Sequence, residues 1–285
     1  MATLSRADGA VEVVYETLAT QRVGAVLHIT LNRPESRNAM SLRMVAELRS
    51  ALESAETGGG VRVVVLRGAD GHFCAGADLK DMAAARMRAM QNDPQVSEAG
   101  VAMDAVAHAN LQFGELCVAY AKTPLALVVI LEGSVMGGGL GLACVADVAL
   151  ACESAAFRLP ETALGVVPAQ IAPFLVERLG YSQAKRLAVT GGRLAAANAL
   201  AIGLVHAVHA SDQIDTALTS VLADILACAP GAVAATKALM AKARLTEPSD
   251  MVQEAAVIFS RAAQGPEGLE GTTAYLQKRK PTWAL

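Results

Sequence analysis

The chain has 285 residues, enough for one large domain or for one domain with a smaller appendage. Its formal net charge of −3 and sequence pI near 6.0 give no electrostatic reason to expect nucleic acid or an anionic membrane as the main partner. Although 53% of the residues are hydrophobic, Gly, Pro or charge interrupts every apolar run well before the ~20 residues that a membrane span needs. We therefore expect a soluble protein.

The cysteines favour a cytoplasmic protein, and the histidines do not predict a metal site. The five cysteines stand in mostly apolar settings and form no Cys-x-x-Cys pair, which is typical of reduced, buried thiols. The first residues contain no signal-peptide hydrophobic region, so we expect a cytoplasmic protein. His206 and His209 lack a third ligand nearby, and the segment reads as a strand or turn, so we predict no metal.

The first part of the chain predicts a hairpin and then a helix. Residues 11–18 and 23–31 are β-rich runs, and residues 19–22 between them suggest the turn. Asn32-Arg33-Pro34 stops the second strand. Ser41 is a good helix N-cap, helical spacing continues through residue 53, and Gly58-Gly59-Gly60 ends the helix.

Two later strands each end in a turn of small residues. Residues 61–67 form an apolar run that leads into the turn around Gly76-Ala77. Residues 125–131 form another, followed by Gly137-Gly138-Gly139 and a small, apolar helix over residues 140–148. Glycines at a helix N-terminus favour an anion, as in an oxyanion hole or phosphate cradle, although a tight turn is the commoner role. Together the two turns can present one N–H each to a single oxygen atom.

A candidate acid or base follows the short strand at residues 147–152. Glu161 stands at a sharp turn among Pro160 and apolar neighbours, where desolvation should raise its pKa and suit proton transfer. A lone Glu at a turn is more often a helix N-terminal charge. From Pro168 onward the pattern is helical, and no low-complexity linker separates this region from the β-rich part.

Several motifs follow one another in a fixed order over nearly the whole chain. They are Leu31-Asn-Arg-Pro34, Ser36-Arg-Asn-Ala-Met40, Phe73-Cys-Ala-Gly-Ala-Asp-Leu-Lys80, the run from Gly133 to Gly139, Asp147, the run from Phe157 to Glu161, Gly165-Val-Val-Pro168, Ala201-Ile-Gly-Leu-Val205 and the run from Pro230 to Lys237. This succession resembles the crotonase superfamily, the enoyl-CoA hydratases and isomerases. The resemblance implies an α/β fold, a spiral of ββα units over residues 1–195 with a C-terminal helical trimerisation region over residues 196–285. It also implies trimers or dimers of trimers, an acyl-CoA thioester substrate and no cofactor, coenzyme A being part of the substrate.

The resemblance also assigns roles to individual residues. The N–H groups of Ala77 and Gly138 would hold the thioester oxygen, and Glu161 would act as acid and base. The remaining positions implied for binding of coenzyme A or the acyl chain are Arg37, Ala75, Asp78, Leu79, Lys80, Gly141, Tyr275 and Lys278. Of these, Tyr275 and Lys278 would reach the nucleotide bound to a neighbouring subunit.

One departure from the family pattern bears on the reaction. Hydratases of the best-known type carry two glutamates, whereas the first position here is Gly141 and only Glu161 remains. A single carboxylate suffices for a Δ3,Δ2-enoyl-CoA isomerase. However, residues 157–161 and 165–173 resemble a subgroup that hydrates branched glutaconyl-CoA esters, including isohexenylglutaconyl-CoA and methylglutaconyl-CoA, and that subgroup also has Gly at this position. We therefore favour a hydratase over an isomerase. A non-catalytic RNA-binding or scaffold role is disfavoured by the acidic balance and by Glu161.

Overall fold

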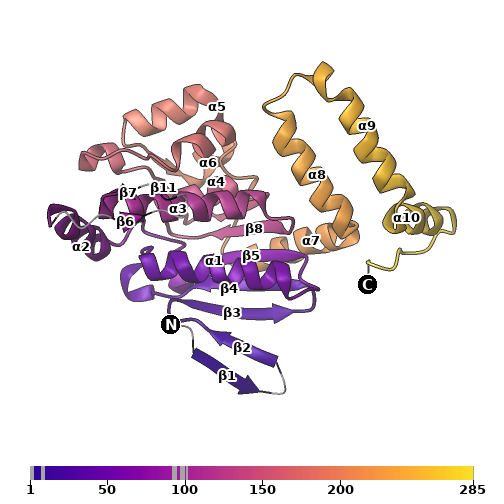
Figure 1. Cartoon of the computed structure of the whole chain (residues 1–285), viewed down its shortest axis with the longest axis horizontal. Coiled ribbons are helices and arrows are strands. Elements are labelled where there is room, and N and C mark those ends of the chain that lie inside the picture. Colours follow the sequence, from indigo (N-terminus) through magenta and orange to yellow (C-terminus); the bar gives the residue numbers. More distant parts are fainter. Residues whose placement is uncertain (1–2, 8–9, 92–94, 97–99, 101, 285) are drawn as a thin grey trace.

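A six-stranded sheet forms the centre of the computed structural model, which describes residues 3–7, 10–91, 95–96, 100 and 102–284 (Figure 1). The strand order is β13-β10-β8-β5-β4-β3. The bounds are β3 (Leu18–Val23), β4 (Val26–Leu31), β5 (Val63–Gly68), β8 (Ala126–Leu131), β10 (Val148–Cys152) and β13 (Ala207–His209). All neighbours from β4 to β13 pair in parallel, and β3 is antiparallel to β4. The carboxyl ends of β5 and β8 therefore meet at one edge of the sheet.

A second sheet of three strands continues from this edge. Its order is β12-β11-β9, with β9 (Ser134–Met136), β11 (Ala156–Arg158) and β12 (Arg193–Ala195). β9 follows β8 in the chain, and β11 follows β10. The chain thus leaves the large sheet after β8 and again after β10, and the strands that follow, β9 and β11, pair in parallel in the small sheet. The first of these steps leads to the glycine turn at Gly137, and the second leads to Glu161.

Helices cover both faces of the large sheet. One hydrophobic cluster joins it to helices of the first two thirds of the chain, and the other joins it to α7. The helices are α1 (Leu42–Thr57), α2 (Leu79–Met90), α3 (Ala105–Lys122), α4 (Gly138–Val145), α5 (Ala172–Val189), α6 (Ala196–Ala201), α7 (Ile214–Ala227), α8 (Pro230–Ala243), α9 (Pro248–Gln264) and α10 (Pro266–Leu276). Two short strand pairs, β1 (Thr3–Ala7) with β2 (Ala10–Val14) and β6 (Gln95–Val96) with β7 (Ala102–Met103), lie outside these two sheets. No single described helix is long and apolar enough to span a membrane.

Several sequence predictions are confirmed. Every residue of β8 is buried, as its uninterrupted apolar run predicts. The Ser41 hydroxyl accepts a hydrogen bond from the Met44 N–H and caps α1, and Gly58 ends that helix. The glycine run lies at a helix N-terminus, although α4 begins at Gly138, two residues earlier than predicted.

The predicted hairpin turn is wrong. Residues 19–22 lie within β3, and the chain reverses at Gly24, where φ is +57°. β3 is the edge strand of the sheet, so its polar residues face solvent without interrupting the strand. A left-handed turn residue is what the reversal requires, and glycine adopts that conformation without steric cost.

Candidate active site

The two glycine turns pack directly against each other. The Met136 N–H donates to the Cys74 carbonyl at 2.9 Å, so the segment after β5 runs beside β9. Beyond this bond, a Cβ on Gly76 would lie 3.5 Å from the Met136 carbonyl oxygen and 4.0 Å from Gly137 Cα. The main chains of the two turns are thus in contact, as predicted from the sequence.

Peptide planarity fixes the direction of the Ala77 N–H. The Gly76 carbonyl accepts a hydrogen bond from the Met40 N–H at 2.7 Å. Because a carbonyl and the following N–H point in opposite directions across a planar trans peptide, the Ala77 N–H points away from Met40. Gly76, with φ of +99°, permits this change of direction. The Ala77 N–H is thus directed away from the strand-like bridge between Met40 and Ala77.

The same argument applies to Gly138, the first residue of α4. The Gly137 carbonyl accepts the first helical hydrogen bond, from the Gly141 N–H at 3.0 Å. The Gly138 N–H therefore points out of the helix N-terminus, which is the positive end of the helix dipole. Within the described parts of the chain, neither the Ala77 N–H nor the Gly138 N–H has a hydrogen-bond acceptor.

Glu161 brings a carboxylate to this pair of N–H groups. It begins a short 3₁₀ helix (Glu161–Leu164) after β11, and its Oε1 atom would lie 3.1 Å from a Cβ on Gly137. Its other oxygen, Oε2, is buried and has no hydrogen-bond partner among the described residues. Burial raises the pKa of Glu161 above its ordinary value, as the sequence predicted. A carboxyl group in this state is suited to exchange protons near neutral pH.

Asp78 is held within the protein by a buried ion pair. Its Oδ2 lies 2.8 Å from Arg33 Nη1, and its Oδ1 accepts a hydrogen bond from the Lys80 N–H and so caps α2. Burial would raise the pKa of Asp78, but the hydrogen bond and charge of Arg33 outweigh it and hold that pKa below its ordinary value. Although the sequence places Asp78 among residues that bind the substrate, both carboxylate oxygens have partners inside the chain.

The other predicted residues of this region surround the same turn. The carbonyl of Arg37 accepts a hydrogen bond from the Ala75 N–H at 3.0 Å, which ties the loop before α1 to the turn. The side chains of Arg37, Leu79 and Lys80 are exposed beside it. These three side chains are therefore free to meet a ligand.

Gly141 lies against two apolar side chains that the sequence analysis did not connect with it. A Cβ on Gly141 would lie 3.2 Å from Ile171 Cγ1 and 3.3 Å from Phe113 Cζ. A side chain at position 141 would therefore require Ile171 and Phe113 to shift by a few tenths of an ångström or more. No local sequence signal relates Phe113 to Gly141, because they lie on different helices, α3 and α4.

Tyr275 and Lys278 lie far from these residues in the same chain. Tyr275 is on α10 and Lys278 follows it, whereas Ala77 immediately precedes the cap of α2. α10 and α2 stand at opposite ends of the long axis of the molecule (Figure 1). Within one subunit the structure does not bring Tyr275 and Lys278 to the candidate site.

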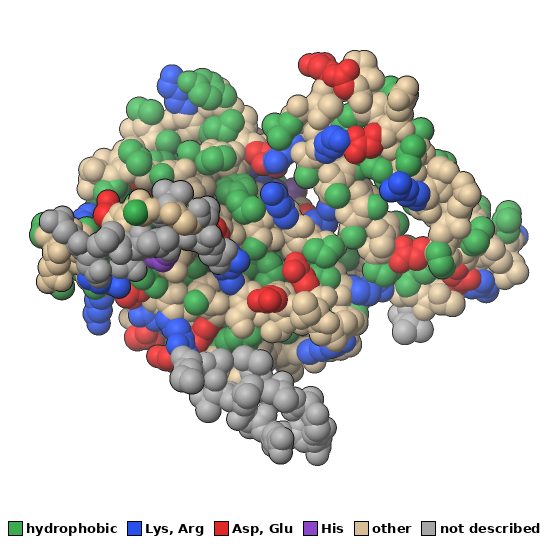
Figure 2. Space-filling model, viewed as in Figure 1, with side chains coloured by type: hydrophobic (Ala, Val, Ile, Leu, Met, Phe, Trp, Pro, Cys, Tyr) green, Lys and Arg blue, Asp and Glu red, His purple; other side chains and the backbone are tan. Residues whose placement is uncertain are grey.

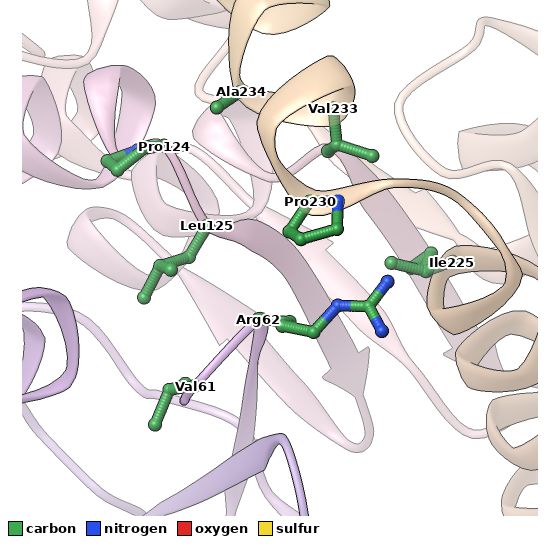
Figure 3. A pocket seen from close by; sticks show the side chains of 8 residues that line it. All are labelled: Val61, Arg62, Pro124, Leu125, Ile225, Pro230, Val233 and Ala234. Atoms are coloured by element: carbon green, nitrogen blue, oxygen red, sulfur yellow. The ribbon is translucent and has the colours of Figure 1, made fainter. Parts of the chain in front are cut away.

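A pocket on the surface lies away from the two turns. An apolar pocket of about 200 Å³ lies between the sheet and α7 and α8, and Figure 3 shows the side chains that line it. It is lined by residues that precede β5 and β8, such as Val61 and Leu125, and so lies at the amino ends of these strands, opposite the candidate site.

Figure 2 shows Lys and Arg side chains scattered among acidic and apolar ones on the face in view, rather than gathered in one basic patch.

The chain passes from one sheet to a second and ends in a helical C-terminal region, and this arrangement defines a protein of the crotonase fold. A family model described as enoyl-CoA hydratase/isomerase matches residues 21–284, and the chain belongs to that family. The structure is similar to that of Pseudomonas aeruginosa AtuE, with a TM-score of 0.87 and 49% identity over 95% of this chain and 100% of the other.

Curated relatives of the chain bear the names of both reaction types. The 2,3-dehydroadipyl-CoA hydratase of Escherichia coli K12 is 33% identical over 93% of this chain and 97% of its own length. The peroxisomal Delta(3,5)-Delta(2,4)-dienoyl-CoA isomerase of Arabidopsis thaliana is 28% identical over 95% of this chain and 98% of its own length. Family membership therefore establishes the class of enzyme and leaves the choice between hydratase and isomerase to the site itself.

Proposed function

We propose that the protein is an enoyl-CoA hydratase in which Ala77 and Gly138 form the oxyanion hole and Glu161 is the acid and base. The observation that supports this most directly is the contact between the two turns that carry these N–H groups, neither of which has an acceptor in the described chain, beside the buried carboxylate of Glu161. Donors fixed in this way stabilise negative charge that develops on a thioester oxygen, and loss of one such donor typically lowers kcat about 10²- to 10³-fold.

The proposed reaction needs only one carboxylate. The oxygen of water bonds to C3 of the enoyl group while a water proton passes to the Glu161 carboxylate. The electrons of the double bond move toward the thioester oxygen, where the Ala77 and Gly138 N–H groups hold the enolate. Glu161 then returns a proton to C2 and the thioester carbonyl re-forms, so one hydrogen and one hydroxyl have been added. A pKa raised toward neutrality lets the same group accept and donate the proton.

The proposed substrate is an acyl-CoA thioester, with coenzyme A as part of the substrate and no further cofactor. The exposed cationic side chains of Arg37 and Lys80 beside the turn are suited to the phosphates of coenzyme A. A branched glutaconyl-CoA ester is the proposed acyl group, because residues 157–161 and 165–173 resemble the subgroup that hydrates such esters.

A Δ3,Δ2-enoyl-CoA isomerase is the second candidate, and the surroundings of Gly141 favour it. Apolar atoms of Phe113 and Ile171, rather than a second carboxylate, occupy that position. Isomerisation uses Glu161 alone, which removes a proton from C2 and returns it to C4 while the thioester oxygen carries the charge. The isomerase among the named relatives supports the same possibility.

Product mass distinguishes the two reactions. The purified protein is incubated with a panel of linear and branched enoyl-CoA thioesters, and the products are analysed by mass spectrometry and chromatography. We expect a product heavier by one water, and formation of an isomer of unchanged mass would favour the second candidate. Glu161→Gln should lower the rate roughly 100- to 10,000-fold and leave binding of free coenzyme A unchanged. Turnover by this variant at the wild-type rate would refute the role of Glu161 in either reaction.

A further inference from the structure

The ring of Phe113 covers the first turn of α4. Its Cζ and Cε2 atoms would lie 3.2 Å and 3.3 Å from a Cβ on Gly138. The same Cζ atom and Cε1 would lie 3.3 Å and 3.6 Å from a Cβ on Gly141. One aromatic ring thus packs on both glycines, and one of these carries the proposed oxyanion donor. Phe113 is only partly buried, so it keeps some accessible surface.

A second set of contacts fixes this ring relative to α5. The Gln170 side chain lies on Gly114, where a Cβ would overlap its amide, and it donates a hydrogen bond to Asn110 Oδ1 at 3.0 Å. Gly114 and Asn110 belong to α3, next to Phe113, and Gln170 precedes Ile171. The two apolar side chains that meet at Gly141 are therefore held by the same junction between α3 and the segment before α5.

We infer that Phe113 is a specificity-determining residue, whose ring limits the acyl group beside the oxyanion site and excludes a carboxylate side chain from position 141. This inference rests on the proposed acyl-CoA site. Because the ring would lie 3.2 Å and 3.3 Å from a Cβ on Gly138 and on Gly141, added atoms at either glycine require it to be displaced. Its apolar surface also disfavours an ionised group, whether from the protein or from the substrate. The acyl carbons that lie against Phe113 and Ile171 are accordingly uncharged.

A stability experiment tests the packing without any assay of activity. Melting temperatures are measured for Gly141→Ala, Gly141→Glu, Phe113→Ala and the two double variants. We expect the Gly141 substitutions to lower Tm strongly alone and much less in the Phe113→Ala background, because the removed ring leaves the space that they need. Losses of Tm that simply add would show that the ring does not oppose a side chain at position 141 and would overturn the inference.

A kinetic experiment tests specificity, with Phe174 as the matched control. Phe174 lies on α5 and packs against the same hydrophobic cluster, but it is not among the atoms nearest to Gly138 or Gly141. Phe113→Leu and Phe113→Ala should raise the ratio of kcat/KM for a 3-branched enoyl-CoA over crotonyl-CoA about tenfold, whereas Phe174→Leu should leave it unchanged. Equal changes in this ratio for the two phenylalanines would overturn the specificity role.

The two experiments separate failure of this inference from failure of the proposed function. If the wild-type protein turns over no enoyl-CoA ester, the proposed function fails, and the Tm cycle still decides whether Phe113 blocks position 141. If turnover is found and the ratio does not respond to Phe113, the specificity role alone is wrong.

Discussion

The carboxyl group of Glu161 is the side chain on which the proposed chemistry depends, and its position has a cost in stability. Oε2 is buried without a hydrogen-bond partner among the described residues, and desolvation raises the pKa of the group. Since the folded-state pKa lies above the unfolded-state value, Glu161 contributes most to stability at pH values below the unfolded pKa. That contribution falls as pH rises through the folded pKa, because ionisation then opposes folding.

The pH dependence of stability therefore reports on Glu161. We expect the free energy of unfolding of the wild type, relative to Glu161→Gln, to decrease between acidic pH and pH 8. Urea unfolding at several pH values measures this difference. A constant difference across the range would mean that Glu161 has an ordinary pKa and would remove the physical reason for its role in proton transfer.

Asp78 provides a test with the opposite sign. Its pKa is lowered in the folded protein, so its contribution to stability is present above the unfolded-state pKa and is lost as pH falls through the folded value. Asp78→Asn keeps an oxygen to cap α2 and removes the charge opposite Arg33, which we expect to cost about 1–3 kcal/mol at pH 7.

The kinetics of this variant separate positioning from binding. If Asp78 acts by holding the Ala77 turn, Asp78→Asn should lower kcat and leave KM for coenzyme A esters nearly unchanged. Asp81→Asn is a control, since Asp81 Oδ2 accepts a hydrogen bond from the Leu42 N–H at the start of α1 and makes no ion pair with Arg33 among the described contacts. A rise in KM alone for Asp78→Asn would instead support direct contact with the ligand, as the sequence suggested.

At the scale of elements, the N-terminus of α4 is the feature that the site requires, and it permits a test of the backbone donor. Gly138→Pro removes the N–H, and proline is well tolerated at the first helical position. Gly138→Ala keeps the N–H, but its Cβ would crowd Phe113 at 3.2 Å, so this variant is not neutral and serves as the steric control. We expect kcat to fall about 10²- to 10³-fold further for proline than for alanine. Equal losses would indicate crowding rather than loss of an oxyanion donor.

The sequence predicts those parts of the fold that local signals determine. A continuous apolar run identified β8, and a cap with helical spacing identified α1. It misplaced the first hairpin because the polar residues of an edge strand resemble a turn, whereas the actual reversal depends on the single Gly24. For such strands, burial is decided by sheet order, which the sequence does not show directly.

The same distinction applies to the site. Converging turns and a desolvated Glu161 follow from local sequence, but the surroundings of Gly141 do not. The sequence showed only that Gly141 replaces the first glutamate of the family pattern, and the structure shows apolar atoms of Phe113 and Ile171 beside it. Long-range packing between α3, α4 and the segment before α5 determines this, and local sequence does not encode it. We accordingly expect Gly141→Glu to lower the free energy of unfolding, and this effect does not depend on the substrate.

At the scale of the whole molecule, the C-terminal helices have features of an interface between copies of the chain. α8 and α9 extend from the body, and the space-filling view is hollowed between them and the rest of the molecule (Figures 1 and 2). Exposed apolar side chains on α8 and α9 include Met240, Val252 and Phe259, and 74% of the surface of Phe259 is accessible. Apolar exposure on an extended helical pair favours association with another copy, as the predicted homo-oligomer requires.

The predicted role of Lys278 can be decided by mixing subunits. Since α10 lies at the far end of the molecule from α2, a Lys278 that binds coenzyme A must come from another subunit (Figure 1). Lys278→Ala oligomers should show a KM raised by a modest factor, because an exposed ion pair contributes about 1 kcal/mol or less. Glu161→Gln oligomers should be nearly inactive. In co-assembled mixtures, active sites with Glu161 from one variant can receive Lys278 from the other, so KM should return toward the wild-type value as the share of Glu161→Gln subunits increases.

Mixtures prepared without subunit exchange are the control and should retain the raised KM. If exchange leaves KM unchanged, or if the protein is monomeric and fully active, Lys278 does not act across a subunit boundary.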